Sequence, residues 1–168
     1  MHPHATVVLP IRKMLVNLDR WLDIAVEFAE KKKFPVENLL QSRLAPDQYP
    51  LVAQVRVACD NAKGAVTRLA NKPVPSHPDT ETTVPELKAR IAKVLELIDG
   101  FRAEDFAGYA ELKISLPWMG GKWITGEEYC QFVVANFYFH TVTAYSILRS
   151  NGVDLGKMDF IGGLDMRD

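Results

Sequence analysis

Apolar residues recur at helical spacing in four long segments of the chain. These segments run from about Val7 to Lys33, Pro50 to Ala70, Thr83 to Gly100 and Thr125 to Ser150. Within each, the apolar positions fall three or four residues apart, which is typical of an amphipathic helix with one buried face. The pattern therefore predicts an all-α fold built as a four-helix bundle.

Local signals support the ends of these helices. Thr83 and Thr125 are each followed three residues later by a glutamate, the spacing of a capping box at a helix start. Gly100 and Asn151-Gly152 follow the third and fourth segments, where helices commonly end. Phe34-Pro35 stops the first, because the residue before a proline avoids helical geometry.

The loop between the second and third helices constrains the topology. It runs from Asn71 to Thr82 and holds Pro73, Pro75 and Pro78, so we expect it to be extended, with Asp79 and Glu81 as turn and cap residues. Such a loop can reach about 40 Å, and a helix of 20 residues is about 30 Å long. The loop can therefore return along the bundle and let the second and third helices run parallel.

A small β-hairpin is predicted between the third and fourth helices. Glu111 to Leu116 alternates polar and apolar residues, and Gly120-Gly121 separates it from a second short run. An isolated hairpin is only marginally stable, so we expect Trp118 and Trp123 to pack it on the bundle, or else to line the mouth of a pocket. After the fourth helix, Phe160 and Ile161 are expected to dock the tail.

Composition fits one domain spanning residues 1–168. The chain is 48% hydrophobic and 24% charged, with a net charge of −1. This balance argues against a nucleic-acid partner, which calls for a concentration of Lys and Arg. The start of the chain lacks the pattern of a signal peptide, and no stretch is apolar enough to span a bilayer, so we expect no membrane association and a cytoplasmic location.

The candidate chemistry lies on the fourth helix. Asn136 and His140 are four residues apart, so they share one face with Tyr129 and several apolar residues. Two interpretations stay open for His140. It is a core histidine bonded to Asn136 or to a backbone carbonyl, or it is the acid/base or ligand anchor of a pocket, with a pKa tuned by burial. Tyr129 is the tyrosine best placed for such a pocket.

The two cysteines, Cys59 and Cys130, both fall within helical patterns. We expect free, buried thiols rather than a disulfide. The chain shows no Gly-rich phosphate loop, no nucleophile elbow and no Cys-x-x-Cys pair, so no motif names a reaction.

Several segments together resemble a bacterial domain-of-unknown-function family within the DinB/YfiT-like metalloenzyme superfamily. The matching segments are Arg43–Asp47, Ala58–Gly64, Asp79–Glu81 with Glu86-Leu87, Asn136–His140 with Ala144-Tyr145, and Leu148-Arg149 with Asn151–Val153. They cover most of the chain. The resemblance implies a four-helix bundle with a crossover between the second and third helices, in agreement with the loop argument.

The resemblance also implies a metal site, from which this chain departs. DinB-like members carry one metal-binding histidine on the second helix and a His-x-x-x-His pair on the fourth. Aligning Leu148-Arg149 and Gly152 with that pattern makes His140 the second histidine of the pair and places Asn136 at the first. An amide is a much poorer ligand than imidazole for zinc or nickel.

The second helix offers no histidine to complete this set. Cys59 lies at the edge of the core face and could reach a metal as a thiolate. Asp60 falls on the opposite face, where we expect it to be solvated or paired with Arg56.

The resulting functional prediction is a DinB-like protein with a degenerate metal site. It binds a small molecule in a pocket formed by His140, Asn136, Tyr129 and Cys59, and no metal ligand is assigned. A divalent transition metal held by Cys59, Asn136 and His140 is an alternative. So is a metal- or thiol-dependent transferase, and so is a structural bundle that self-associates. The aromatic hairpin favours a homodimer.

Overall fold

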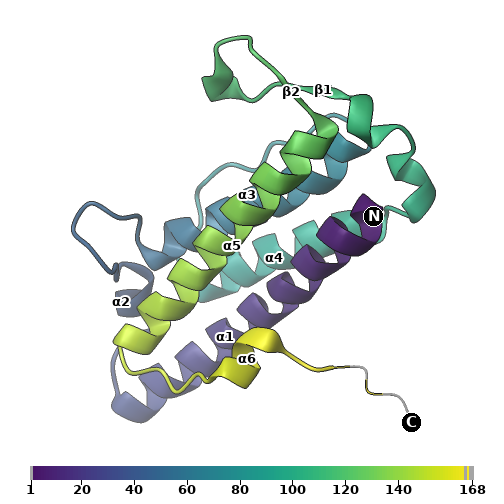
Figure 1. Ribbon diagram of the computed structural model, residues 1–168. Coiled ribbons are helices and arrows are strands. Elements are labelled where there is room, and N and C mark those ends of the chain that lie inside the picture. Colours follow the sequence, from purple (N-terminus) through teal and green to yellow (C-terminus); the bar gives the residue numbers. More distant parts are fainter. Residues whose placement is uncertain (1, 165, 167–168) are drawn as a thin grey trace.

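Four long helices form an elongated bundle in the computed structural model, which describes residues 2–164 and 166 of the 168. They are α1 (Leu9–Lys32), α3 (Leu51–Leu69), α4 (Val84–Asp99) and α5 (Gly126–Ser150). α3 packs against both α5 and α4, and α1 contacts all three of the others (Figure 1). The predicted all-α four-helix bundle is confirmed.

Short elements extend and connect the long helices. They are the π-helix His4–Val8, which leads into α1, the helices α2 (Glu37–Leu40) and α6 (Lys157–Ile161), and the 3₁₀ turns Ala103–Phe106, Tyr109–Glu111 and Pro117–Met119. No helix within the described part of the chain is long and apolar enough to cross a membrane.

Both predicted capping boxes are present. The Thr83 hydroxyl accepts from the backbone N–H of Glu86, and the Glu86 carboxylate accepts from the backbone N–H of Thr83 at 2.9 Å. Thr125 and Glu128 repeat the arrangement at the start of α5. The backbone hydrogen bonds from Thr82 and Thr83 lower the pKa of Glu86, which keeps its carboxylate charged beside the positive end of the helix dipole.

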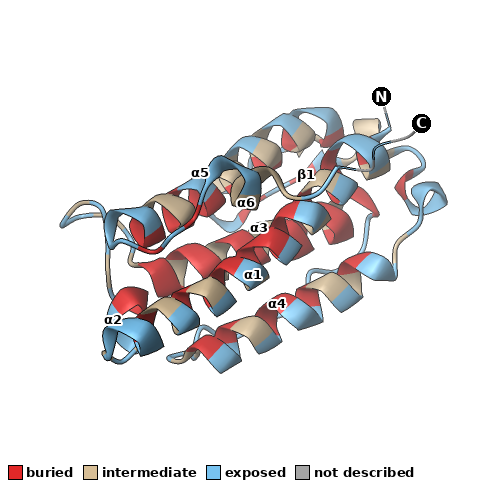
Figure 2. Cartoon of the chain, turned by 90° about the horizontal axis from the view of Figure 1, so that it is seen from below, coloured by how far each residue is buried: buried red, intermediate tan, exposed pale blue. Residues whose placement is uncertain are grey.

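The segment between α3 and α4 is the predicted crossover. It returns along the length of the bundle, so α3 and α4 run in the same direction and α1 and α5 run opposite to them (Figure 1). The buried faces of the four helices meet in one hydrophobic core (Figure 2). Its largest fully buried side chains are Trp21, Tyr129, Phe106 and Phe137.

The polar face of α3 differs from the sequence-based expectation. By helical spacing, the face opposite the apolar stripe holds Arg56, Asp60, Lys63 and Thr67. Lys63 and Thr67 are nevertheless buried. Asp60 does not pair with Arg56: its carboxylate binds Lys63 at 2.7 Å and Arg90 of α4 at 2.8 Å. Arg56 pairs instead with Glu81 of the crossover at 3.1 Å. The helical pattern of α3 predicts one buried apolar face, but α3 packs against both α5 and α4. Part of its polar face is therefore also covered.

The hairpin is present, but it docks differently from the prediction. β1 (Lys113–Ile114) pairs antiparallel with β2 (Ile124–Thr125). Gly120 and Gly121 both adopt positive φ, at 60° and 83°, which explains the Gly-Gly pair.

The two tryptophans do little to anchor this hairpin. Trp118 touches Phe132 of α5, with ring centres 5.9 Å apart, yet it is 68% exposed, and Trp123 is 52% exposed. Ile114 and Leu116 are buried instead and fix the hairpin to the bundle.

The segment after α5 packs against α1, as expected for Phe160. The Phe160 ring stacks on Trp21 with centres 5.5 Å apart. The indole N–H of Trp21 donates to the carbonyl of Asp159 at 3.0 Å, and the Asn17 amide donates to the carbonyl of Phe160 at 2.8 Å. Because Trp21 lies in the core, these contacts tie α6 to the bundle.

Candidate functional site

His140 is joined to α3 through a glutamine. The imidazole is buried, and its Nδ1 lies 2.7 Å from Oε1 of Gln54. The Gln54 amide nitrogen donates to the carbonyl of Tyr49 at 3.0 Å, which turns Oε1 toward the histidine. Since Oε1 only accepts, Nδ1 of His140 carries the proton. Gln54 thus takes the place that the sequence assigned to Asn136 or a backbone carbonyl.

The protonation state of His140 follows from its surroundings. Burial lowers the pKa of His140 below the ordinary value for histidine. The ring is therefore neutral at pH 7, with its proton on Nδ1 and an unprotonated Nε2.

Asn136 has a partner of its own on α3. Its amide nitrogen donates to Oδ1 of Asn61 at 2.8 Å, and the Asn61 amide nitrogen donates to the carbonyl of Val57 at 2.9 Å. The pairs Gln54–His140 and Asn61–Asn136 thus both link α3 to α5. Asn136 and His140 do lie on one face of α5, and that face packs against α3. They do not bond to each other: Asn136 meets Asn61 and His140 meets Gln54.

A cavity of about 190 Å³ opens beside the Asn61–Asn136 pair, between α3, α5 and the hairpin. Its lining consists of Val57, Asp60, Asn61, Arg68, Leu116, Pro117, Trp118, Tyr129, Phe132 and Asn136. Two of the four predicted pocket residues, Asn136 and Tyr129, are among them. His140 and Cys59 are not. The exposed Trp118 lies at this cavity, which was the alternative role considered for it.

Tyr129 lies deep in the wall of this cavity. Its hydroxyl accepts from the Arg68 guanidinium at 3.2 Å, and the guanidinium carbon lies 5.8 Å from the ring centre. Burial raises the pKa of the Tyr129 phenol, and the Arg68 charge offsets only part of this effect. Tyr129 therefore stays a neutral phenol that holds Arg68 in place.

Cys59 is a core residue with no exposed surface. Burial raises the pKa of its thiol to about 12, so the sulfur is a protonated thiol at physiological pH, and it does not line the cavity. Cys130 is partly buried and is also free, and burial raises its pKa to about 11.

The side chains near the expected metal site do not fit a metal ion. Carboxamides stand at Asn61 and Asn136, and their oxygens are weak ligands for a transition metal. Across residues 2–164 and 166, no group of three or more His, Cys, Asp or Glu side chains is placed to hold a metal ion.

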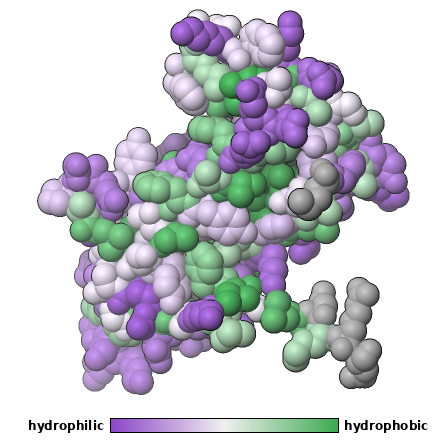
Figure 3. All heavy atoms as spheres, in the orientation of Figure 1, coloured by the Kyte–Doolittle hydropathy of each residue, from purple (hydrophilic) through white to green (hydrophobic). Residues whose placement is uncertain are grey.

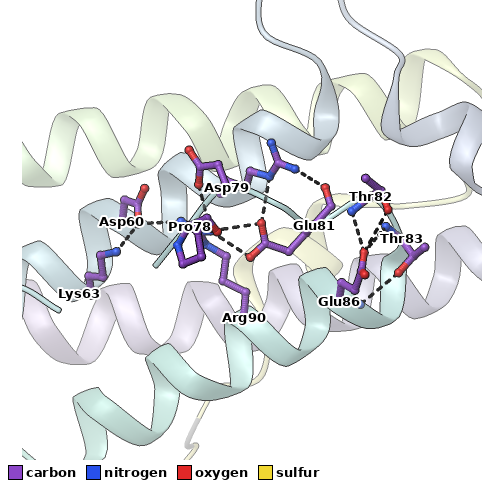
Figure 4. Close-up of polar contacts among 10 residues, drawn as sticks. Asp60, Lys63, Pro78, Asp79, Glu81, Thr82, Thr83, Glu86 and Arg90 are labelled. Atoms are coloured by element: carbon purple, nitrogen blue, oxygen red, sulfur yellow. Dashed lines mark hydrogen bonds and ion pairs between the residues drawn. The ribbon is translucent and has the colours of Figure 1, made fainter. Parts of the chain in front are cut away.

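Asp60 is fixed at the edge of the cavity by a charge network centred on the buried Arg90 (Figure 4). Arg90, whose side chain is only 2% exposed, binds Asp60 at 2.8 Å, Glu81 at 3.0 Å and Asp79 at 3.0 Å. Burial opposes the charge of Arg90, but the hydrogen bond to Glu81 and the charges of Asp60 and Glu81 outweigh it and raise its pKa. The network keeps a carboxylate oriented beside the two asparagines.

Sequence reasoning missed the α3 side of the site. Gln54 and Asn61 lie seven residues apart, a spacing that returns to the same helix face, and each meets one residue of the Asn136/His140 pair. That shared spacing was the available signal. No sequence signal identifies Arg68, because its partner Tyr129 lies 61 positions away in the chain.

Comparison with known proteins agrees with the fold. Residues 4–161 match the family described as Domain of unknown function (DUF1993). The crystal structure of a DinB family member protein from Shewanella denitrificans is 46% identical to the chain, with a TM-score of 0.92. The match covers 96% of this chain and 92% of that one. A search of curated proteins finds no match.

Proposed function

The chain belongs to the DUF1993 family of DinB-like proteins, and on this basis we propose that it binds a small molecule in the cavity between α3, α5 and the hairpin. The observation that carries the proposal is the composition of this cavity. A few fixed polar groups are set among apolar and aromatic walls, which is the usual make-up of a small-molecule site.

The polar groups have hydrogen-bonding capacity to spare. A carboxamide offers two donors and two acceptor lone pairs, and the bond between Asn136 and Asn61 uses one donor and one lone pair. The remaining groups, together with the Asp60 carboxylate, suit a ligand that both donates and accepts.

The apolar walls suit a planar ligand. Trp118 and Phe132 present aromatic surface at the outer side of the cavity. The volume of about 190 Å³ is below the roughly 300–1000 Å³ of sites for drug-sized ligands. The expected ligand is therefore a compound of fragment size, or one part of a longer molecule.

The proposed binding does not use a metal ion. An amide, Asn136, stands where the resemblance places the first histidine of the pair, and it is bonded to a second amide, Asn61. His140 is a positioning residue in this proposal: its bond to Gln54 sets α5 against α3 one helical turn from Asn136.

A titration with benzamide tests the proposal. Its ring matches Trp118 and Phe132, and its amide matches the two asparagines. In ¹H–¹⁵N NMR spectra of protein dialysed against EDTA, we expect shifts at the Trp118 indole and at the Asn61 and Asn136 side-chain amides.

The matched variant is the double substitution Asn61→Leu/Asn136→Leu. Replacing both partners leaves no orphaned amide, so the fold is expected to survive while binding is lost. Shifts that map elsewhere, persist in the double variant, or require added zinc would contradict the proposal. His77→Gln, at a separate cavity beside the crossover, is the control.

A further inference from the structure

A second, strongly basic cavity adjoins the first at Arg68. It has a volume of about 160 Å³ and is lined by Arg68, Asn71, Lys72, Leu112, Lys113, Ile114 and Ser115. Three of these residues are cationic and none is acidic, although the whole chain carries a net charge of −1. Positive charge is therefore concentrated where the end of α3 meets the hairpin.

These cations are not neutralised by the protein. Among the described residues, none of Arg68, Lys72 and Lys113 forms an ion pair with a carboxylate. Arg68 donates to the neutral Tyr129 hydroxyl, and the Lys113 ammonium lies 4.7 Å from the centre of the Trp123 ring.

Helix stability does not account for the whole cluster. Arg68 and Lys72 lie near the C-terminus of α3, where cations complement the helix dipole. Lys113 comes from the hairpin, a different element, and is brought to the same cavity by the fold.

The position of Arg68 depends on Gly64. A Cβ atom on Gly64 would overlap Nη1 of Arg68, so the guanidinium lies against the bare backbone of α3 while Tyr129 holds it from α5. Arg68 lines both cavities in this position. A planar, fixed guanidinium is well suited to bind the oxygens of an anion.

We propose that the basic cavity is a phosphate subsite and that the ligand of the adjoining cavity is a phosphate monoester of a small planar compound. The planar part lies against Trp118 and Phe132, and the phosphate is bound by Arg68, Lys72 and Lys113. Three cations match the near-double charge of a phosphate monoester better than the single charge of a carboxylate. This proposal rests on the proposed function, since it names the class of ligand for that site.

Binding of phenyl phosphate, benzoate and phenol tests the proposal, with inorganic phosphate as a fourth probe. We expect phenyl phosphate to bind about tenfold more tightly than phenol, the gain expected from about one charge-assisted hydrogen bond, and more tightly than benzoate. The gain should shrink as salt is raised. Equal affinities for phenyl phosphate and phenol would overturn the subsite, and tighter binding of benzoate would overturn its assignment to phosphate.

Two variants separate the placement of Arg68 from the net charge. Arg68→Gln removes the charge, whereas Gly64→Ala keeps all three cations and displaces the guanidinium. Both should remove the advantage of phenyl phosphate over phenol. Lys93→Gln removes a cation beside a different cavity and should leave that advantage unchanged. An unchanged advantage in both Arg68→Gln and Gly64→Ala would overturn the proposal.

The outcomes distinguish this subsite from the proposed function. If phenol or benzamide binds without any gain from phosphate, the small-molecule site stands and the subsite fails. If only inorganic phosphate binds, with shifts confined to Arg68 and Lys113, the basic cavity stands without the planar site. If no probe binds, both proposals fail.

Discussion

Hydrogen-bond partners decide the chemistry of the buried polar residues in this protein. His140 is neutral with its proton on Nδ1, because burial lowers its pKa and the Gln54 oxygen faces that nitrogen. Asn136 is paired with another amide instead of a metal or a histidine. Both residues hold α5 against α3, and Asn136 additionally borders the cavity.

The lowered pKa of His140 predicts how stability depends on pH. The unfolded chain takes up this proton at a pH near 6.5, and the folded protein does so only at a lower pH. The free energy of unfolding should therefore be fully retained above about pH 6.5 and fall as the pH drops from there through the folded pKa.

Urea unfolding between pH 7.5 and pH 5.5 measures this dependence. His140→Gln should show a shallower slope than the unaltered protein. Burial also lowers the pKa of His77, so His77→Gln serves as the control for the part of the slope that does not come from His140. If the free energy of unfolding changes with pH as steeply in His140→Gln as in the unaltered protein, His140 does not have a lowered pKa in the folded state.

Two helical glycines should respond oppositely to alanine. At Gly126, a Cβ would overlap the backbone carbonyl oxygen of Tyr109, which cannot move aside cheaply. Gly126→Ala should therefore cost about 2 kcal/mol or more, as overpacking does. At Gly64 the obstacle is the flexible end of Arg68, and alanine gains up to about 1 kcal/mol in helix propensity.

Chemical denaturation of the two variants checks this contrast. Gly64→Ala should leave the free energy of unfolding nearly unchanged or slightly raised. If Gly64→Ala is as destabilising as Gly126→Ala, the Arg68 guanidinium cannot leave its place between Gly64 and Tyr129 at low cost.

At the scale of elements, the crossover is fixed by charge. Glu81 accepts from both Arg56 and Arg90, and Arg90 also binds Asp60, so the segment before α4 is tied to α3 and α4 at once (Figure 4). Burial alone would raise the pKa of Glu81, but the hydrogen bond from Arg90 and the charges of Arg90 and Arg56 outweigh it and lower this pKa.

Removing Arg90 should be costly. Arg90→Met keeps the bulk but leaves the largely buried Glu81 carboxylate with one partner fewer, so we expect a loss of about 3 kcal/mol in the free energy of unfolding. The matched control is Arg12→Met, which breaks the exposed pair with Asp99 and should cost less than about 1 kcal/mol. Equal losses in the two variants would show that the network contributes no more than a surface pair.

The elements were predictable because their signals are local. The capping boxes at Thr83 and Thr125 and the Gly120-Gly121 turn act within a few residues, so the sequence alone places these helices and the hairpin. The contacts of Trp118 and the pairing of Asp60 depend on residues distant in sequence. Arg90 lies 30 positions from Asp60, and no local pattern identifies it as the partner.

At the scale of the molecule, the cavity lies where the segment between β1 and β2 meets α3 and α5. The crossover makes α3 central, with α5 on one side and α4 on the other, so its polar residues serve two interfaces (Figure 2). On the face shown in Figure 3, apolar residues gather toward the middle and hydrophilic ones toward the edges.

The homodimer expected from the aromatic hairpin stays a prediction. Trp123 is 52% exposed, which leaves it available for a contact between two copies. Sedimentation or light scattering should give twice the 18.9 kDa chain mass, and Trp123→Ser should shift the protein toward the monomer. A monomer in the unaltered protein at high concentration would contradict this prediction.

The most direct test of the account is the metal content of untagged protein purified without chelators, followed by calorimetric titration with zinc. We predict far less than one equivalent of any transition metal, and no zinc binding that depends on His140. About one equivalent of metal, lost in His140→Ala while the fold is retained, would contradict the account. That result would mean that the two amide pairs rearrange to form a metal site.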